Sequence, residues 1–177
     1  YAEVYKHALL NGKEATTHIE HNFNTHDDLS SLKNLDDYLF KGIQTKLNIV
    51  VEDEKEKGTR KFLNLGHTFG HAVEYEHKIP HGHAVMIGIL YQFIVANEIL
   101  GTNYDVQHFI QYMQRLDYPL DIISQLNFDD TYRFMLLDKK NNKEGIQMVL
   151  LQDWGKPTVV HVDKATHIKA FHVLQSY

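Results

Sequence analysis

The sequence has no cysteine among its 177 residues. It can therefore form neither disulfide bonds nor thiolate metal sites, and any transition-metal site must use imidazole and carboxylate ligands. The lack of cysteine also fits a reducing compartment, and we expect a cytoplasmic protein.

Other features are absent as well. No run of about 18 apolar residues occurs and no signal peptide is recognisable, so no membrane partner is expected. The formal net charge is −5, which argues against a broad nucleic-acid-binding surface. No Gly-x-Gly-x-x-Gly turn follows a predicted strand, so any dinucleotide-phosphate site is expected outside this chain.

The composition is that of a globular protein. Hydrophobic residues make up 43% and aromatic residues 11% of the chain, enough for one sizeable core over residues 1–177. Thirteen histidines are the unusual feature. The chain opens on a pattern typical of the middle of a helix, and we expect it to be a piece of a longer protein.

Apolar periodicity predicts several helices. They span residues 1–10, 31 to the charged run 52–57, 84–100, 106–116, 129–137 and 163–174, with a polar loop over 21–28. The expected inward positions in the first helix are Ala2, Tyr5, Leu9 and Leu10. The second helix has a long amphipathic pattern formed by Leu32, Leu35, Leu39, Ile43, Leu47 and Val50. Ser31 and Asp163 are predicted N-caps, and Gly58 is a predicted stop after the charged end of the second helix. Residues 84–100 are apolar almost all round, which is typical of a central buried helix.

Only one part of the chain has the pattern of strands. Residues 146–151 and 157–162 flank the turn-forming stretch Asp153-Trp-Gly155, an arrangement that predicts a β-hairpin. The expected fold is therefore mostly α-helical with a small hairpin.

The most informative stretch covers residues 60–74. Arg60, Asn64, His67 and His71 recur every three to four residues, so from Asn64 on they can share one face of a helix. Such a face carries a guanidinium, an amide and two imidazoles in place of an apolar stripe. Because converging polar groups are costly to pack, we expect something to bind between them. The simpler alternative is a histidine-rich surface helix.

A metal site is the chemistry that these histidines favour. His67 and His71 form an i, i+4 pair, and His81 on the following Pro-Gly turn could supply a third ligand. Either Glu74 or Glu3 could provide the acid needed for charge balance. The pair lacks the neighbouring glutamate of zinc peptidases, which disfavours that class.

Basic residues in patterned segments suggest an anionic substrate. Arg60, Lys46 and Lys6 belong to patterned helical segments, and Lys139 and Lys140 join the last bundle helix to the hairpin. Taken singly, each lysine is more often a solvated surface residue than a ligand contact.

Five motifs follow one another along nearly the whole chain. They are Ala2-Glu-Val-Tyr-Lys6; Lys46 with Val50-Val-Glu-Asp-Glu-Lys-Glu-Lys-Gly58; Arg60 with Leu63-Asn-Leu-Gly-His-Thr-Phe-Gly-His-Ala-Val-Glu74; His81-Gly82; and Asp138-Lys-Lys140. In this order they resemble the 3-dehydroquinate synthase family. The resemblance implies the C-terminal helical domain of that fold, which binds metal and substrate, with an N-terminal NAD-binding α/β domain absent from this chain.

The resemblance also implies a ligand set. The zinc ligands would be Glu3, His67 and His81, which makes His71 a contact of the substrate phosphate instead of a ligand. This chain has His83 two residues after His81, where the family commonly has a glutamate, so His83 stays an alternative ligand.

The remaining implied residues contact the substrate. They are Arg60 and Lys46 at the carboxylate, Asn64, His71 and either Lys139 or Lys140 at the phosphate, and Lys6 and Glu56 at further active-site positions. The substrate implied is 3-deoxy-D-arabino-heptulosonate 7-phosphate, and the products are 3-dehydroquinate and phosphate. The enzyme would be a lyase of the shikimate pathway, which leads to chorismate and the aromatic amino acids, and would use Zn²⁺ or Co²⁺ together with NAD⁺. A homodimer is expected for the full-length protein, and the isolated piece is expected to be inactive.

Three alternatives stay open. Another sugar-phosphate cyclase or a metal-dependent polyol dehydrogenase of the same superfamily would share the metal helix. A helical His-Asp metal phosphohydrolase would use a pair such as His26-Asp27, but that pair falls in a polar loop. A purely structural helical module would bind no metal.

Overall fold

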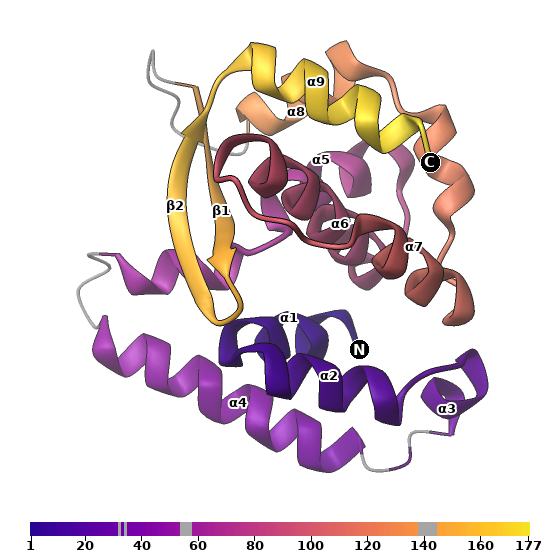
Figure 1. Cartoon of the computed structure of the whole chain (residues 1–177), viewed down its shortest axis with the longest axis vertical. Coiled ribbons are helices and arrows are strands. Elements are labelled where there is room, and N and C mark those ends of the chain that lie inside the picture. The colour runs from indigo at the N-terminus through magenta and orange to yellow at the C-terminus, as the bar shows by residue number, and fades with distance from the viewer. Residues whose placement is uncertain (32, 34, 54–57, 138–144) are drawn as a thin grey trace.

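The computed structural model describes residues 1–31, 33, 35–53, 58–137 and 145–177. In this part of the chain, helices precede and follow a single β-hairpin (Figure 1). The elements are α1 (Ala2–Asn11), α2 (Lys13–Asn22), α3 (His26–Ser30), α4 (Leu35–Glu52), η1 (Thr59–Asn64), α5 (His67–His77), α6 (His81–Ile99), α7 (Val106–Arg115), η2 (Leu120–Gln125), α8 (Phe128–Leu137), β1 (Ile146–Asp153), β2 (Lys156–Val162) and α9 (Lys164–Gln175).

Helix α6 forms the centre of the core, as its apolar sequence predicts. Every residue from 84 to 96 is buried, and α1, α5, α7, α9 and β1 all pack against this helix. Among the described helices α6 alone is long and apolar enough to cross a membrane, but 72% of its most apolar window is buried inside the protein. That burial is typical of the core helix of a globular domain.

Close backbone contact brings α5 onto α6. A methyl group on Gly88 of α6 would lie 1.8 Å from the carbonyl oxygen of Gly66, and one on Gly70 of α5 would lie 2.8 Å from the carbonyl oxygen of Ala84. Gly66 also has a φ of +77°, in the left-handed region that favours glycine. These glycines set the separation between the two helices whose first residues, His67 and His81, face one another.

The hairpin and the last helix follow the sequence prediction. Strands β1 and β2 are antiparallel, with Ile146 opposite Val162, and Gly155 at the turn has a φ of +72°. Strand β1 packs against α6, where the Leu151 amide donates a hydrogen bond to Gln92 Oε1 at 3.2 Å. Asp163 caps α9 by accepting a hydrogen bond from the Thr166 amide at 2.7 Å.

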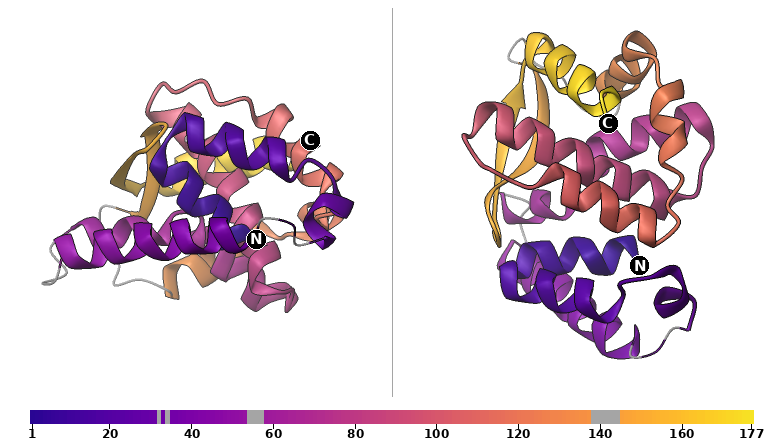
Figure 2. Two further views of the ribbon diagram at one scale, coloured as in Figure 1. Left: turned by 90° about the horizontal axis from the view of Figure 1, so that it is seen from below. Right: turned by 45° about the vertical axis from the view of Figure 1, so that its right-hand side comes forward.

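The N-terminal helices form a second layer. Helix α1 packs against α2, α4 and α6, and Figure 1 and the right-hand view of Figure 2 show α1, α2 and α4 side by side below α6. In α1 the predicted inward residues Ala2, Tyr5 and Leu9 are buried, whereas Leu10 is half-buried. Helix α1 therefore joins the N-terminal layer to the core.

The segment after α1 differs from the prediction. Helix α2 is an additional element, and part of the predicted loop over 21–28 is helical because α3 starts at His26. The cause is a capping box, in which the side chain of Thr25 accepts from the Asp28 amide and Asp28 accepts from the Thr25 amide. Ser31 follows α3 instead of capping the next helix, which begins at Leu35.

The amphipathic pattern predicted for α4 leaves most of its apolar stripe exposed, although Leu35 and Val50 are half-buried. Leu39, Ile43 and Leu47 are 43%, 58% and 56% exposed, and of the residues described in α4 only Tyr38 and Gly42 are buried. Leu32 lies outside the described residues. The spacing of apolar residues in a helix identifies its apolar face but does not show whether another part of the protein packs on that face. Phe40 and Val51 extend the same exposed surface, at 69% and 74%.

Candidate metal and anion site

The first residues of two helices and one acid from a third meet in space. His67 opens α5, His81 opens α6, and Glu3 lies in the first turn of α1. His67 Nε2 lies 3.1 Å from Glu3 Oε1, and His81 Nε2 lies 3.8 Å from the same oxygen. The three candidate ligand atoms are within 4.8 Å of one another. This spacing allows a single ion to contact all three.

The expected helix face from Asn64 to His71 does not form. Asn64 ends the 3-10 helix η1, and Leu65 and the left-handed Gly66 separate it from α5. The turn changes the direction of the chain, because a left-handed residue cannot continue a helix. Asn64 and His67 nevertheless line the same pocket.

The hydrogen bonds made by Nδ1 of His67 and of His81, on the side of each ring away from Glu3, show which ring nitrogen carries the hydrogen. His67 Nδ1 lies 3.0 Å from the carbonyl oxygen of Leu65, and His81 Nδ1 lies 2.9 Å from Glu74 Oε2. A carbonyl and a carboxylate can only accept, so each Nδ1 must carry the hydrogen. In the neutral ring each Nε2 then presents a lone pair toward Glu3.

The centre of this cluster suits a cation. Glu3 Oε1 is buried and receives no well-aligned hydrogen bond. Two imidazole lone pairs and a carboxylate oxygen that face one another repel unless a positive charge lies between them. One carboxylate and two imidazoles are a common zinc ligand set, which leaves a position open for a substrate oxygen.

A positive charge lies on the other side of Glu3. Lys6 Nζ lies 2.5 Å from Glu3 Oε2, and the Lys6 side chain is only 4% exposed. Burial disfavours the charged form of Glu3, but His67, when its Nε2 also carries a hydrogen, and Lys6 more than offset this effect and lower the pKa of Glu3. Burial also lowers the pKa of Lys6, against the opposing effect of Glu3. The carboxylate is therefore held ionised, as a metal ligand must be.

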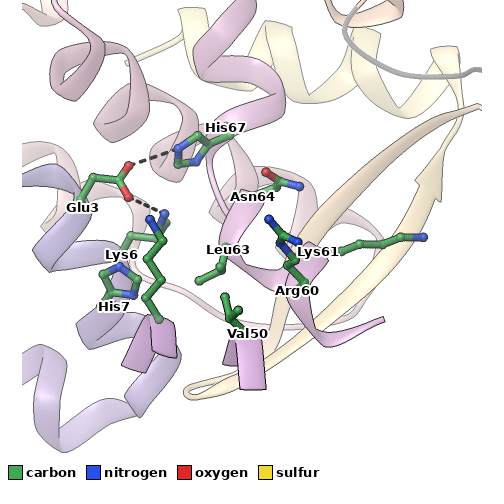
Figure 3. Close-up of a pocket in the computed structure, with 10 residues that line it drawn as sticks. Glu3, Lys6, His7, Val50, Arg60, Lys61, Leu63, Asn64 and His67 are labelled. Atoms are coloured by element: carbon green, nitrogen blue, oxygen red, sulfur yellow. Dashed lines mark hydrogen bonds and ion pairs between the residues drawn. The ribbon is translucent and has the colours of Figure 1, made fainter. Parts of the chain in front are cut away.

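A pocket of about 480 Å³ extends from Glu3 and His67 across to η1 and α4. Its lining residues are Glu3, Lys6, His7, Lys46, Val50, Arg60, Lys61, Leu63, Asn64 and His67. Figure 3 shows Arg60 and Asn64 across the pocket from Glu3, with Lys61 extending away from the others. The predicted residues Lys6, Lys46, Arg60 and Asn64 therefore share one pocket with two of the candidate ligands. Lys6, Lys46 and Arg60 around one opening favour an anionic ligand.

His71 lies next to the candidate ligands but does not line this pocket. Its ring centroid is 5.3 Å from that of His67 and 5.9 Å from that of His81. His71 also forms a second candidate ligand group with Glu74 and His81. The naive pairing of His67 with His71 is thus replaced by two overlapping groups that share His81.

Several other sequence predictions can be compared with the structure. The ring of His83 packs against Tyr118, at a centroid distance of 5.3 Å, so His81 and not His83 faces Glu3. His26 is exposed and lies 3.8 Å from Asp117, in no candidate metal group of the described residues. Glu56, Lys139 and Lys140 lie outside the described residues.

Two residues near the site were not assigned from the sequence alone. His7 lines the pocket, is buried, and has an Nδ1 without a hydrogen-bond partner, and burial lowers its pKa to about 4. Its position four residues after Glu3 on α1 was the available signal. Leu65 contributes only its carbonyl oxygen, which no side-chain pattern can reveal.

Comparison with known proteins agrees with this geometry. Residues 1–141 match the family model described as 3-dehydroquinate synthase C-terminal. The chain belongs to the 3-dehydroquinate synthase family. It is 73% identical over its whole length to a 3-dehydroquinate synthase of Staphylococcus epidermidis and 62% identical over 99% of its length to one of Staphylococcus haemolyticus. It spans 50% and 49% of these relatives, so about half of their length has no counterpart here.

The fold agrees with that of a solved sugar-phosphate cyclase. A structure of 2-deoxy-scyllo-inosose synthase complexed with carbaglucose-6-phosphate, NAD⁺ and Co²⁺ superimposes with a TM-score of 0.76 at 25% identity. The match covers 99% of this chain and 50% of that one. The predicted fold class, the helical C-terminal domain of the dehydroquinate synthase-like fold with a small hairpin, is confirmed.

Proposed function

We propose that this chain is the metal- and substrate-binding half of a 3-dehydroquinate synthase. The full enzyme would convert 3-deoxy-D-arabino-heptulosonate 7-phosphate into 3-dehydroquinate and phosphate, as a lyase of the shikimate pathway. The names of the curated relatives support this reaction. The observation that carries the proposal is the convergence of Glu3, His67 and His81 beside a pocket lined with cations.

Glu3, His67 and His81 would hold the metal ion. Zn²⁺ suits one carboxylate and two imidazoles, and Co²⁺, the ion named for the inosose synthase complex, accepts the same donors. When bound, the ion supplies Lewis acidity that polarises a substrate oxygen. The ionised Glu3 balances part of its charge, and the hydrogen bonds of the two Nδ1 atoms keep both Nε2 atoms directed at it.

The cationic residues would hold the two anionic ends of the substrate. Arg60 and Lys46 would bind the carboxylate, because a guanidinium fork matches carboxylate geometry. Asn64 and His71 would contact the phosphate. Lys6 adds a charge from a buried position, where electrostatic interactions are stronger than in water. Fixing both ends orients the atoms between them. Glu56, Lys139 and Lys140 stay predictions.

A second domain would complete the enzyme. The inosose synthase complex contains NAD⁺, and this chain has no glycine-rich dinucleotide turn. We therefore assign NAD⁺ to an N-terminal α/β domain that covers the pocket. The exposed Ile43 and Leu47 support this, since they lie one helical turn from the pocket residues Lys46 and Val50. A homodimer and a cytoplasmic location stay predictions.

A chimera tests the function. We would fuse this chain to the N-terminal half of the Staphylococcus epidermidis relative, in place of the half that it matches at 73% identity. With NAD⁺, Zn²⁺ and the heptulosonate phosphate, the chimera should release phosphate and form 3-dehydroquinate. Glu3→Gln should abolish this turnover, whereas Glu14→Gln on the exposed side of α2 should leave it unchanged.

Two further samples complete the test. The isolated chain, given the same substrate and NAD⁺, should release no phosphate, and release would contradict the need for a second domain. A phosphosugar without a carboxylate, such as glucose 6-phosphate, should not be turned over by the chimera. Preferential turnover of that compound would favour the alternative, another sugar-phosphate cyclase.

A further inference from the structure

The two ring nitrogens of His81 face two different carboxylates. Its Nε2 lies 3.8 Å from Glu3 Oε1, and its Nδ1 lies 2.9 Å from Glu74 Oε2. Because Glu74 can only accept in its ionised form, the ring carries its hydrogen on Nδ1. The contact with Glu74 thus decides both the tautomer and the direction of the His81 ring.

The position of His81 makes this contact important. His81 is the first residue of α6, and its side chain is 45% exposed. Of the described residues, Glu74 alone forms a hydrogen bond to its ring. An exposed imidazole at a helix end can rotate about its χ angles, so without this bond nothing equivalent holds Nε2 toward the other ligands.

His67 is held differently. Its side chain is 13% exposed, and its Nδ1 is bonded to the main chain at Leu65. A backbone acceptor inside a packed turn does not depend on one surface side chain. Loss of Glu74 should therefore disturb His81 and leave His67 in place.

We propose that Glu74 is a positioning residue for the metal site, which holds His81 with Nε2 toward the ion. The proposal rests on the metal ligand set given under Proposed function. Helix α5 thereby contributes His67 directly and Glu74 through His81, seven residues apart on the same face. Carboxylate partners of this kind orient metal-bound histidines and raise their basicity.

The same contact gives a role to the second candidate group, His71, Glu74 and His81. Within that group, however, His81 Nδ1 and Glu74 Oε2 are already hydrogen bonded to each other. The proposal therefore predicts one ion per chain and makes Glu74 an outer partner of that ion, not a ligand of another.

Zinc titration of the 177-residue chain tests the proposal, with chelator competition to measure the affinity. Glu74→Ala should weaken zinc binding about 10- to 100-fold, the usual effect of removing such a partner. Glu74→Gln keeps an acceptor oxygen and should recover part of this loss. Glu76→Gln, on the same helix but bonded to Thr131, is the matched control and should stay within about twofold of the wild type.

Two readouts separate positioning from a general effect on folding. Nitrogen-15 NMR of the metal-free chain should show the Nδ1–H form of His81 in the wild type and a mixture of tautomers in Glu74→Ala. In a His81→Ala background, Glu74→Ala should cause no further loss of affinity, because its effect acts through that ring.

The outcomes are distinguishable. If the wild type binds no zinc, the metal site and this inference both fail. If it binds one ion and Glu74→Ala binds equally well, only the inference fails. If the wild type binds two ions and Glu74→Ala binds one, Glu74 is a ligand of a second site and the positioning role is wrong.

Discussion

Gly88 and Gly66 touch through their backbones, on α6 and on the turn before α5. A methyl group on Gly88 would lie 1.8 Å from the Gly66 carbonyl oxygen. Because that oxygen belongs to the backbone, no side-chain movement can remove the clash. The same contact sets where α5 starts and so where His67 lies. The proposed metal site therefore depends on a glycine that touches none of the candidate ligands.

Gly88→Ala should accordingly be one of the most damaging small substitutions. We expect it to lower the free energy of unfolding by about 3 kcal/mol or more, the upper end of overpacking effects. Urea denaturation measures this change. Gly82→Ala in the same helix is the control, because its methyl would lie 3.6 Å from the Ala2 side chain, an ordinary contact, and should change stability by less than about 1 kcal/mol.

A buried histidine should make stability depend on pH. His167 is fully buried, with Nδ1 2.9 Å from the Tyr91 hydroxyl, and burial lowers its pKa from 6.5 to about 4. Between these values the unfolded chain binds a proton that the folded chain does not. The contribution of His167 to the free energy of unfolding is therefore fully present above pH 6.5 and is lost as the pH drops toward 4. Between pH 7 and pH 5 this group should lower the free energy of unfolding by about 2 kcal/mol.

Chemical denaturation at pH 7 and pH 5 measures this loss. His167→Gln should reduce the difference between the two pH values, whatever its effect on stability at either one. His172→Gln, at an exposed position of the same helix, should leave the difference unchanged. An equal pH difference in all three proteins would contradict the role of His167.

The apolar stripe of α4 should contribute little to the stability of the isolated chain. Leu47 is 56% exposed, so Leu47→Ala should lower the free energy of unfolding by less than about 1 kcal/mol. Ile87→Ala in the fully buried α6 should lower it by about 2 to 5 kcal/mol. Thermal and urea unfolding of both variants would show whether α4 carries part of the core.

Lys46 should matter for substrate binding and not for folding. In the chimeric enzyme Lys46→Ala should raise the KM for the heptulosonate phosphate by about 10- to 100-fold, the effect of losing one charged hydrogen bond. Lys41→Ala is the control on the same helix, since Lys41 lies near the Tyr38 ring and does not line the pocket. A KM that is equal in both variants would remove Lys46 from the site.

The sequence predicted the elements whose local signals are strong. The uniform apolar run of α6, the Asp163 cap and the hairpin turn at Gly155 each act over a few residues, and each occurs as expected. The capping box that forms α3 is also local, but it was hidden in a stretch of polar residues. Leu39, Ile43 and Leu47 on the apolar face of α4 are exposed, because the pattern of one helix contains no information about its neighbours.

The site shows the same limit. Spacing alone could predict that His67 and His71 lie close together, but it could not predict that Glu3, from the first helix, lies beside His67. Glu3 became a candidate ligand through the family resemblance, and its proximity to His67 depends on how α1 packs on α6. The break at Gly66 was missed, since the regular spacing from Asn64 to His71 concealed a change of direction.

Crystals of the chain grown with zinc test the central idea most directly. Anomalous diffraction at the zinc absorption edge locates the ion without reference to any assumed role. We expect one peak per chain, within coordination distance of Glu3, His67 Nε2 and His81 Nε2. A peak between His71, Glu74 and His81 instead, or no peak at Glu3, would contradict the proposed metal site.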